Sequence, residues 1–196
     1  EGTWLKKFPN TGNIHDLATR TIAIIGIGCI GSRVARRLEG FGAKIIVHDP
    51  YVPDEKIKEM GYEPVTKEEL CRRSDIVTIH LRESEATNKF IGEKELALMK
   101  PTTTIVNTAR AGLIDEEALI KALEERRIQG AALDVFDIEP LPAGHPFLGL
   151  DNVTITSHLA GSSNDVMVNS FTIIFEDLKR YMNHQEVRGA VKQFKG

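Results

Sequence analysis

Three side chains that could handle a carboxylate and a proton each follow a different short apolar segment of the chain: Arg110, Glu139 and His158. A guanidinium grips a carboxylate through two parallel hydrogen bonds, and an imidazole changes its charge near neutral pH. A carboxylate beside the other ring nitrogen fixes the imidazole tautomer and favours its charged form. Each residue alone is more often structural. Together they predict reduction of a 2-keto acid, with Arg110 holding the substrate, His158 donating the proton and Glu139 supporting His158.

Such a reduction needs a hydride donor, which proteins take from a bound cofactor, and a glycine motif offers a place to hold one. Gly26, Gly28 and Gly31 form a G-x-G-x-x-G pattern between a strand pattern at 21–25 and a helical pattern at 30–41. Gly26 permits a tight turn, Gly28 lets backbone approach a pyrophosphate, and Gly31 lets the helix pack against the strand. We expect a dinucleotide to contact this motif at Gly26, Gly28, Cys29, Ile30 and Gly31.

An acidic residue, Asp49, follows the glycine motif at about the 20-residue distance at which a ribose-binding acid belongs. Its carboxylate can accept hydrogen bonds from the adenosine ribose hydroxyls, and it would repel a 2′-phosphate. The sequence therefore favours NAD over NADP. The alternative is that Asp49 only caps a turn before Pro50.

The elements that position these residues alternate from residue 21 onward. Expected strands are Thr21–Ile25, Lys44–His48, Ile76–His80, Thr104–Asn107, Ala131–Val135 and Val153–Thr156. Expected helices are Ile30–Phe41, Asp54–Met60, Lys67–Arg73, Glu93–Met99, Glu116–Arg127 and Asn164–Met182. The alternation predicts an α/β fold with a Rossmann-type, doubly wound parallel sheet in three layers. Ligands bind beyond the carboxyl ends of such strands, so Arg110, Glu139 and His158 should converge near the nicotinamide.

The composition is that of an ordinary globular protein, with 196 residues, 41% hydrophobic and 27% charged, and a net charge of −3. No basic run favours nucleic acid, and no apolar run approaches the ~20 residues that span a bilayer. Cys29 and Cys71 lie in no ligand cluster, so we expect no metal site and a reducing, cytoplasmic location. We expect a single nucleotide-binding domain over 1–196, with 1–20 as a lead-in arm.

Five motifs, taken in order, resemble those of the D-isomer-specific 2-hydroxyacid dehydrogenases: GIGCIG, VHDP, MKPTTTIVNTARAGLIDEEAL, ALDVFDIEPLP and ITSHLAG. The resemblance runs from about Trp4 to Val191. It implies that Arg110 is the catalytic arginine and that Glu139 is paired with the catalytic His158. It also implies NAD as cofactor, a small 2-hydroxy or 2-keto acid as substrate, and a homodimer in the full-length enzyme. Phosphoglycerate and glycerate or hydroxypyruvate are the first substrates to consider.

The same resemblance implies further cofactor contacts. Asp134 matches the residue that meets the nicotinamide carboxamide, and Thr108 and Ala109 would contact the cofactor through their backbone. The implied cofactor-binding residues beyond the glycine motif and Asp49 are His80, Thr108, Ala109, Arg110, Asp134, His158 and Gly161.

The chain departs from the family pattern at several positions. Cys29 stands where the phosphate loop often carries arginine or another polar residue, so one pyrophosphate contact is lost. Arg82 stands where the family often has the proline of His-x-Pro, which alters the adenosine-side wall. Ala111 and Ser157 replace glycine and proline, which changes backbone stiffness more than chemistry.

The family also has a flavodoxin-like substrate lobe of about a hundred residues, split by the nucleotide-binding domain. We expect that nothing before Trp4 supplies this lobe and that residues 183–196 are a remnant of the segment returning to it. The expectation is therefore cofactor binding with little or no turnover.

Two alternatives stay open at this point. C-terminal-binding-protein corepressors resemble these dehydrogenases but act as NAD(H)-responsive interaction proteins, and they can retain the Arg, Glu and His set. Another Rossmann enzyme, similar to alanine dehydrogenase or adenosylhomocysteinase, is disfavoured by the ordered segments around Arg110, Glu139 and His158.

Overall fold

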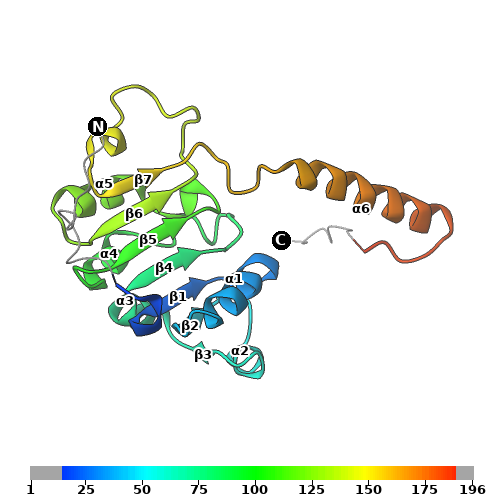
Figure 1. The fold of residues 1–196 in the computed structure, drawn as a ribbon, viewed down its shortest axis with the longest axis horizontal. Coiled ribbons are helices and arrows are strands. Elements are labelled where there is room, and N and C mark those ends of the chain that lie inside the picture. Colours follow the sequence, from blue (N-terminus) through cyan, green and yellow to red (C-terminus); the bar gives the residue numbers. More distant parts are fainter. Residues whose placement is uncertain (1–14, 189–196) are drawn as a thin grey trace, which may run out of the picture. The chain divides into compact units, whose positions relative to one another are not determined.

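The computed structural model describes residues 15–188, and the chain divides into two compact units, Glu1–Ser157 and His158–Gly196. The first unit holds a β-sheet with its helices, and the second holds one long helix (Figure 1). The single domain over 1–196 stays a prediction. The expected arm at 1–20 lies mostly outside the described residues, whose first element is a short 3-10 helix, η2 (Leu17–Thr19). The segment 183–196 is described only as far as residue 188.

The parallel sheet has the strand order β3-β2-β1-β4-β5-β6-β7 (Figure 1). The strands are β1 (Thr21–Ile25), β2 (Lys44–His48), β3 (Glu63–Pro64), β4 (Ile76–Ile79), β5 (Thr104–Asn107), β6 (Gly130–Leu133) and β7 (Val153–Ile155). The order reverses between β1 and β4, where Ile22 pairs with Ile76. Ligands of doubly wound sheets bind at such a reversal, so the predicted fold class is confirmed together with the position of its binding crevice.

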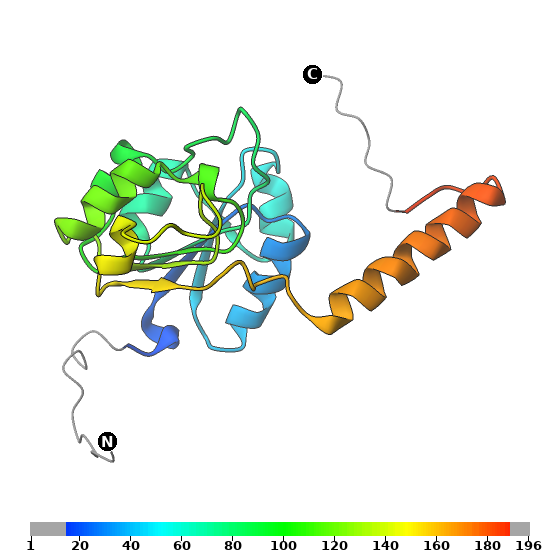
Figure 2. The same ribbon diagram turned by 90° about the horizontal axis from the view of Figure 1, so that it is seen from above.

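Helices cover both faces of the sheet because successive strand residues point to opposite sides. Ile22 and Ile24 of β1 pack with one set of helices, and Ala23 and Ile25 pack with the other. The first set is α1 (Cys29–Glu39) and α2 (Asp54–Glu59). The second set is α3 (Lys67–Arg73), α4 (Glu93–Leu98) and α5 (Glu116–Glu124), with the 3-10 helices η3 (Ala111–Leu113) and η4 (Pro146–Gly149) also in this unit. Figure 2 shows α1 and α3–α5 on opposite sides of the sheet.

The structure differs from the predicted elements at several points, among them β6, which runs from Gly130 to Leu133 and not from Ala131 to Val135, and α5, which ends at Glu124 and not at Arg127. The edge strand β3 was not predicted, because it has only two residues and includes Pro64, which cannot donate to a ladder. Strand β4 ends at Ile79, so His80 lies in the loop beyond it. Helix α1 begins at Cys29, because Gly28 is its N-cap.

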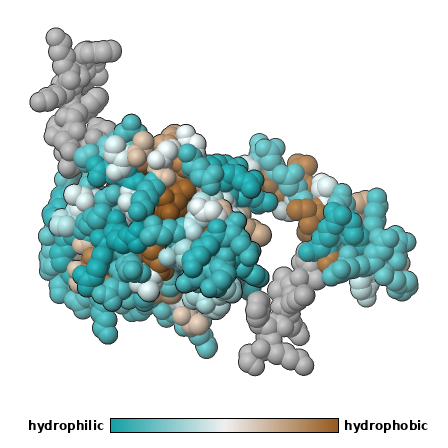
Figure 3. All heavy atoms as spheres, turned by 90° about the horizontal axis from the view of Figure 1, so that it is seen from below, coloured by the Kyte–Doolittle hydropathy of each residue, from teal (hydrophilic) through white to brown (hydrophobic). Residues whose placement is uncertain are grey.

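The second unit contains α6 (Asn164–Met182), which begins as predicted after the N-cap Ser163. Large apolar side chains are exposed along it, including Phe171, Ile174 and Leu178. Apolar and polar side chains alternate over this helix in Figure 3. Within residues 15–188, no helix combines the length and apolar character needed to cross a membrane.

Candidate functional site

The glycine loop is shaped by close backbone contacts. Gly26 has φ +88°, and a Cβ there would lie 2.9 Å from the carbonyl of His80 and from the amide nitrogen of Leu81. A Cβ at Gly31 would overlap the carbonyl oxygen of Gly26. By contrast, a Cβ at Gly28 would meet no atom within 4 Å. The fold therefore requires glycine at Gly26 and Gly31, whereas at Gly28 the reason for glycine is a group that approaches from outside the chain.

The surroundings of this loop suit a diphosphate. Gly28 is the N-cap of α1, and the first turn of that helix contains no acidic side chain. The N–H groups and partial positive charge of a helix N-terminus bind anionic oxygen atoms. Open space at Gly28 leaves room for a phosphate beside the backbone. The loop thus fits the pyrophosphate of a dinucleotide.

Asp49 is tied to this loop at the end of β2. Its Oδ2 accepts a hydrogen bond from the Ile27 N–H at 2.8 Å, and its Oδ1 accepts one from the Tyr51 N–H at 2.8 Å. The second bond caps the turn that follows β2, which was the alternative role predicted for Asp49. Each carboxylate oxygen can accept a second bond, so capping does not prevent Asp49 from holding ribose hydroxyls. The ribose contact stays a prediction.

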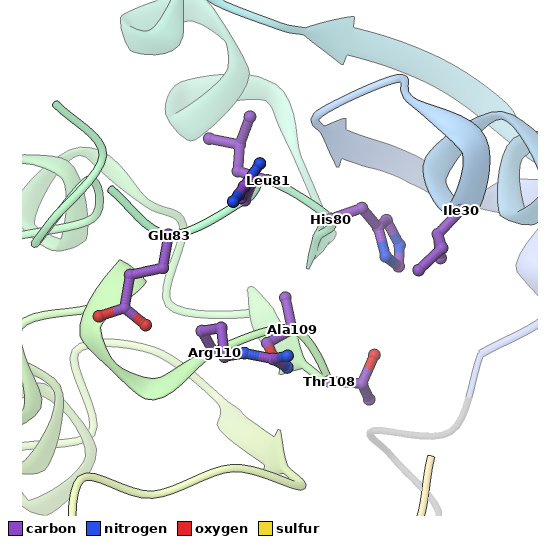
Figure 4. A pocket seen from close by; sticks show the side chains of 8 residues that line it. Ile30, His80, Leu81, Glu83, Thr108, Ala109 and Arg110 are labelled. Atoms are coloured by element: carbon purple, nitrogen blue, oxygen red, sulfur yellow. The ribbon is translucent and has the colours of Figure 1, made fainter. Parts of the chain in front are cut away.

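A cavity of about 500 Å³ opens beside the loop, between the first turn of α1 and the ends of β4 and β5. It is lined by Ile30, His80, Leu81, Arg82, Glu83, Thr108, Ala109 and Arg110. In Figure 4, Ile30 and His80 lie on one side of the cavity, and Thr108 and Arg110 lie on the other. The structure therefore brings five predicted site residues together at the reversal of strand order.

The loop that carries Arg110 is held by Asn107, the last residue of β5. Its side chain is 2% exposed, donates from Nδ2 to the Arg110 carbonyl at 2.9 Å and accepts at Oδ1 from the Ala109 N–H at 3.0 Å. The Arg110 side chain itself is exposed, and its Nη1 donates to the Ala109 carbonyl at 2.6 Å. Sequence reasoning gave Asn107 no role. Its position at a strand end before an exposed loop was the available signal.

Asp134 is anchored beside this loop. It is 2% exposed, its N–H donates to the Asn107 carbonyl at 3.0 Å, and its carboxylate accepts from the Thr156 hydroxyl. Its contact with the nicotinamide carboxamide stays a prediction. Glu139 is exposed in the segment after β6, and its Oε1 accepts from the Phe136 N–H at 3.0 Å. The carboxyl ends of β5 and β6 are thus linked through backbone groups, and those of β6 and β7 through the side chains of Asp134 and Thr156.

His158 and Gly161 belong to the second unit. His158 is exposed and has φ +56°, a conformation in which histidine is among the enriched non-glycine residues. The structure brings together Arg110, Thr108 and His80, whereas the meeting of His158 with Arg110 and Glu139 stays a prediction.

Among the side chains that line this cavity, the imidazole of His80 has a pKa that burial shifts. Desolvation lowers the pKa of its imidazole, and Nε2 lies 3.0 Å from the Thr78 hydroxyl. The neutral ring can therefore present its other nitrogen to the cavity as donor or acceptor. Among the residues that the structure describes, no three His, Cys, Asp or Glu side chains are grouped to hold a metal ion.

A glycine turn after the first strand, an acid after the second and a cavity at the reversal of strand order define a dinucleotide-binding domain. The chain belongs to the family described as the NAD binding domain of D-isomer specific 2-hydroxyacid dehydrogenases. Residues 1–160 match the sequence pattern of this family. NAD is the cofactor of this family, in agreement with the shape of the loop.

Named relatives agree with this assignment. The chain is 42% identical to D-3-phosphoglycerate dehydrogenase of Methanocaldococcus jannaschii, over 90% of the chain and 34% of the relative. It is 42% identical to glyoxylate reductase of Korarchaeum cryptofilum, over 84% of the chain and 49% of the relative. The crystal structure of D-lactate dehydrogenase with NAD+ from Lactobacillus jensenii superposes with a TM-score of 0.84 at 26% identity, over 95% of this chain and 60% of that one. The chain spans a third to a half of these curated relatives.

Proposed function

We propose that this chain forms the cofactor-binding part of an NAD(H)-dependent oxidoreductase that interconverts a D-2-hydroxy acid and its 2-keto acid. The observation that carries the proposal is the position of Arg110, which lines the cavity next to the glycine loop on a backbone held by Asn107. A guanidinium there can hold a substrate carboxylate within the same crevice as the cofactor.

The roles of the other residues follow from this placement. NAD(H), when bound, accepts or supplies the hydride. Arg110 orients the substrate carboxylate and polarises the neighbouring carbonyl. His158 gives the keto oxygen its proton during reduction and takes it back during oxidation. Glu139 accepts a hydrogen bond from the other ring nitrogen of His158 and favours the imidazolium. The relatives are dehydrogenases and reductases, which favours this enzyme over a corepressor-like regulator.

Direct titration with NADH and with NADPH, followed by cofactor fluorescence, tests the cofactor part of the proposal. We expect tighter binding of NADH. Asp49→Asn keeps one oxygen, now of an amide, as an acceptor but removes the negative charge, so it should reduce the ratio of NADH affinity to NADPH affinity. Asp151→Asn is the matched control, because Asp151 pairs with Arg126 outside the cavity. Binding of neither cofactor would contradict the proposal.

The wider properties of the whole protein are also proposals. We propose a homodimer in the cytoplasm that acts on a small 2-hydroxy or 2-keto acid, with phosphoglycerate or glycerate and hydroxypyruvate tested first. The 196-residue chain alone should bind cofactor but turn over little, because its relatives are two to three times as long. Sedimentation and a spectrophotometric assay of the full-length protein check the assembly and the activity. Substantial turnover by the 196-residue chain would overturn the expectation of inactivity.

A further inference from the structure

We propose that Arg82 is the cationic side chain that binds the diphosphate of the cofactor in this chain. The inference rests on the proposed function and assigns a residue that neither the motifs nor the family places there. The glycine loop and the first residues of α1, which read Gly26-Ile27-Gly28-Cys29-Ile30-Gly31-Ser32, contain no charged side chain. A diphosphate with two negative charges would meet only backbone N–H groups and the helix dipole there.

Arg82 lies next to this loop. A Cβ on Gly26 would be 2.9 Å from the Leu81 amide nitrogen. The backbone of the glycine loop is therefore packed directly against the backbone at Leu81. Arg82 is the next residue, and it lines the same cavity as Ile30 in the first turn of α1. An arginine side chain is long enough to cover that short separation, and its planar fork suits phosphate oxygens.

The backbone of Arg82 is fixed, whereas its side chain is available. Leu81, which precedes it, is 6% exposed, and the backbone carbonyl of Arg82 itself accepts a hydrogen bond from the buried Thr87 hydroxyl at 2.8 Å. The Arg82 side chain is exposed, and no described carboxylate lies within 4.0 Å of its guanidinium. Glu83 is adjacent in sequence, but its carboxylate packs against Gly112 of η3. An unpaired cation at a cavity wall attracts an anionic ligand.

The second arginine in the cavity has a different task. Arg110 lines the far side, beyond Thr108 and Ala109, and the proposed function assigns it to the substrate carboxylate (Figure 4). The two guanidinium groups would then divide the cavity between two anions. Arg82 would bind the diphosphate near α1, and Arg110 would bind the substrate near the end of β5.

The test compares ligands that differ in phosphate. Binding of NADH, ADP and adenosine to the full chain is measured by fluorescence and calorimetry, for the unsubstituted protein and for Arg82→Gln. We expect Arg82→Gln to weaken NADH and ADP by about ten-fold, the range for losing one charge-assisted hydrogen bond, and to leave adenosine unchanged. The loss should shrink at high salt, because screening weakens the interaction that was removed.

Two further variants complete the test. Arg72→Gln is the matched control, since Arg72 is exposed on α3 and pairs with Glu68 at 2.9 Å outside the cavity. Adding Cys29→Arg to Arg82→Gln should restore ADP binding, because it returns a cation to the same loop. Unchanged ADP affinity in Arg82→Gln, or an equal loss for adenosine, overturns the assignment of Arg82 while the proposed function stands. Failure of the unsubstituted chain to bind NADH overturns both.

Discussion

The glycine loop and the loops that carry the proposed catalytic residues Arg110 and Glu139, called the catalytic loops below, lie at the same edge of the sheet but are built in different ways. The glycine loop is determined by backbone contact, since Gly26 touches His80 and Gly31 has no room for a side chain. The catalytic loops present exposed side chains, Arg110 and Glu139, on backbone that a few hydrogen bonds hold. The first region needs only its own chain to reach its working shape. Under the proposed function, the side chains of the second region act on a substrate.

Two glycines of the same loop give the sharpest test of this contrast. Gly31→Ala should destabilise the domain by at least about 3 kcal/mol, because its Cβ would overlap the Gly26 carbonyl. Gly28→Ala should keep most of the stability, since its Cβ meets nothing within 4 Å, but should weaken NADH binding. Thermal unfolding and NADH titration measure the two effects. Equal stability losses in the two variants would show that the loop is not fixed by this contact.

Substitutions at the proposed catalytic residues Arg110 and His158 should lower activity and leave the stability of the domain nearly unchanged. In the full-length protein, His158→Gln should lower kcat by ~10²–10⁴, the usual contribution of a general acid, and Arg110→Lys should lower kcat/KM through lost two-point binding. Both side chains are exposed, so the unfolding temperature should change little. Steady-state kinetics beside thermal unfolding separates the two effects. Near-wild-type rates in either variant would refute its assigned role.

The same contrast explains what the sequence could predict. Strand–helix alternation and the glycine spacing predicted the sheet, its binding edge and the loop, because these depend on periodicity and local sterics. The edge strand β3 was missed, because two residues leave no period to detect. The role of Asn107 was missed as well, since its two hydrogen bonds depend on a turn that has no sequence signature of its own. The meeting of Glu139 with His158 is a long-range arrangement that spacing cannot establish.

The reactivity of the two cysteines tests whether the glycine loop is accessible in the folded chain. Cys29 is exposed on that loop, whereas Cys71 is buried in α3, where desolvation raises the pKa of its thiol to about 11. Because the thiolate is the reactive form, Cys29 should react with a maleimide or disulfide reagent at least about ten-fold faster than Cys71. Saturating NADH should slow the reaction at Cys29. Removal of the fast phase by Cys29→Ser is the control, and equal reactivity of both thiols would contradict the structure.

His80 contacts both the glycine loop and the cavity that Arg110 lines. Its replacement should have the smallest effect on stability among these predictions. The residue touches Gly26 through its backbone and lines the cavity with Arg110. Burial lowers the pKa of its imidazole, so between that lowered value and the ordinary ~6.5 the unfolded chain binds more protons than the folded one. The stability that His80 contributes is complete above pH ~6.5 and declines as the pH falls through this window.

Replacement of His80 by glutamine should therefore flatten the acid side of the stability profile, by no more than ~1.4 kcal/mol per pH unit. His184→Gln, at an exposed histidine of the second unit, should leave the profile unchanged. Urea unfolding at several pH values measures the slope. An unaltered slope in His80→Gln would mean that the ring is solvated in the folded chain. The segment at His80 would then be solvated like the catalytic loops, and not packed like the glycine loop.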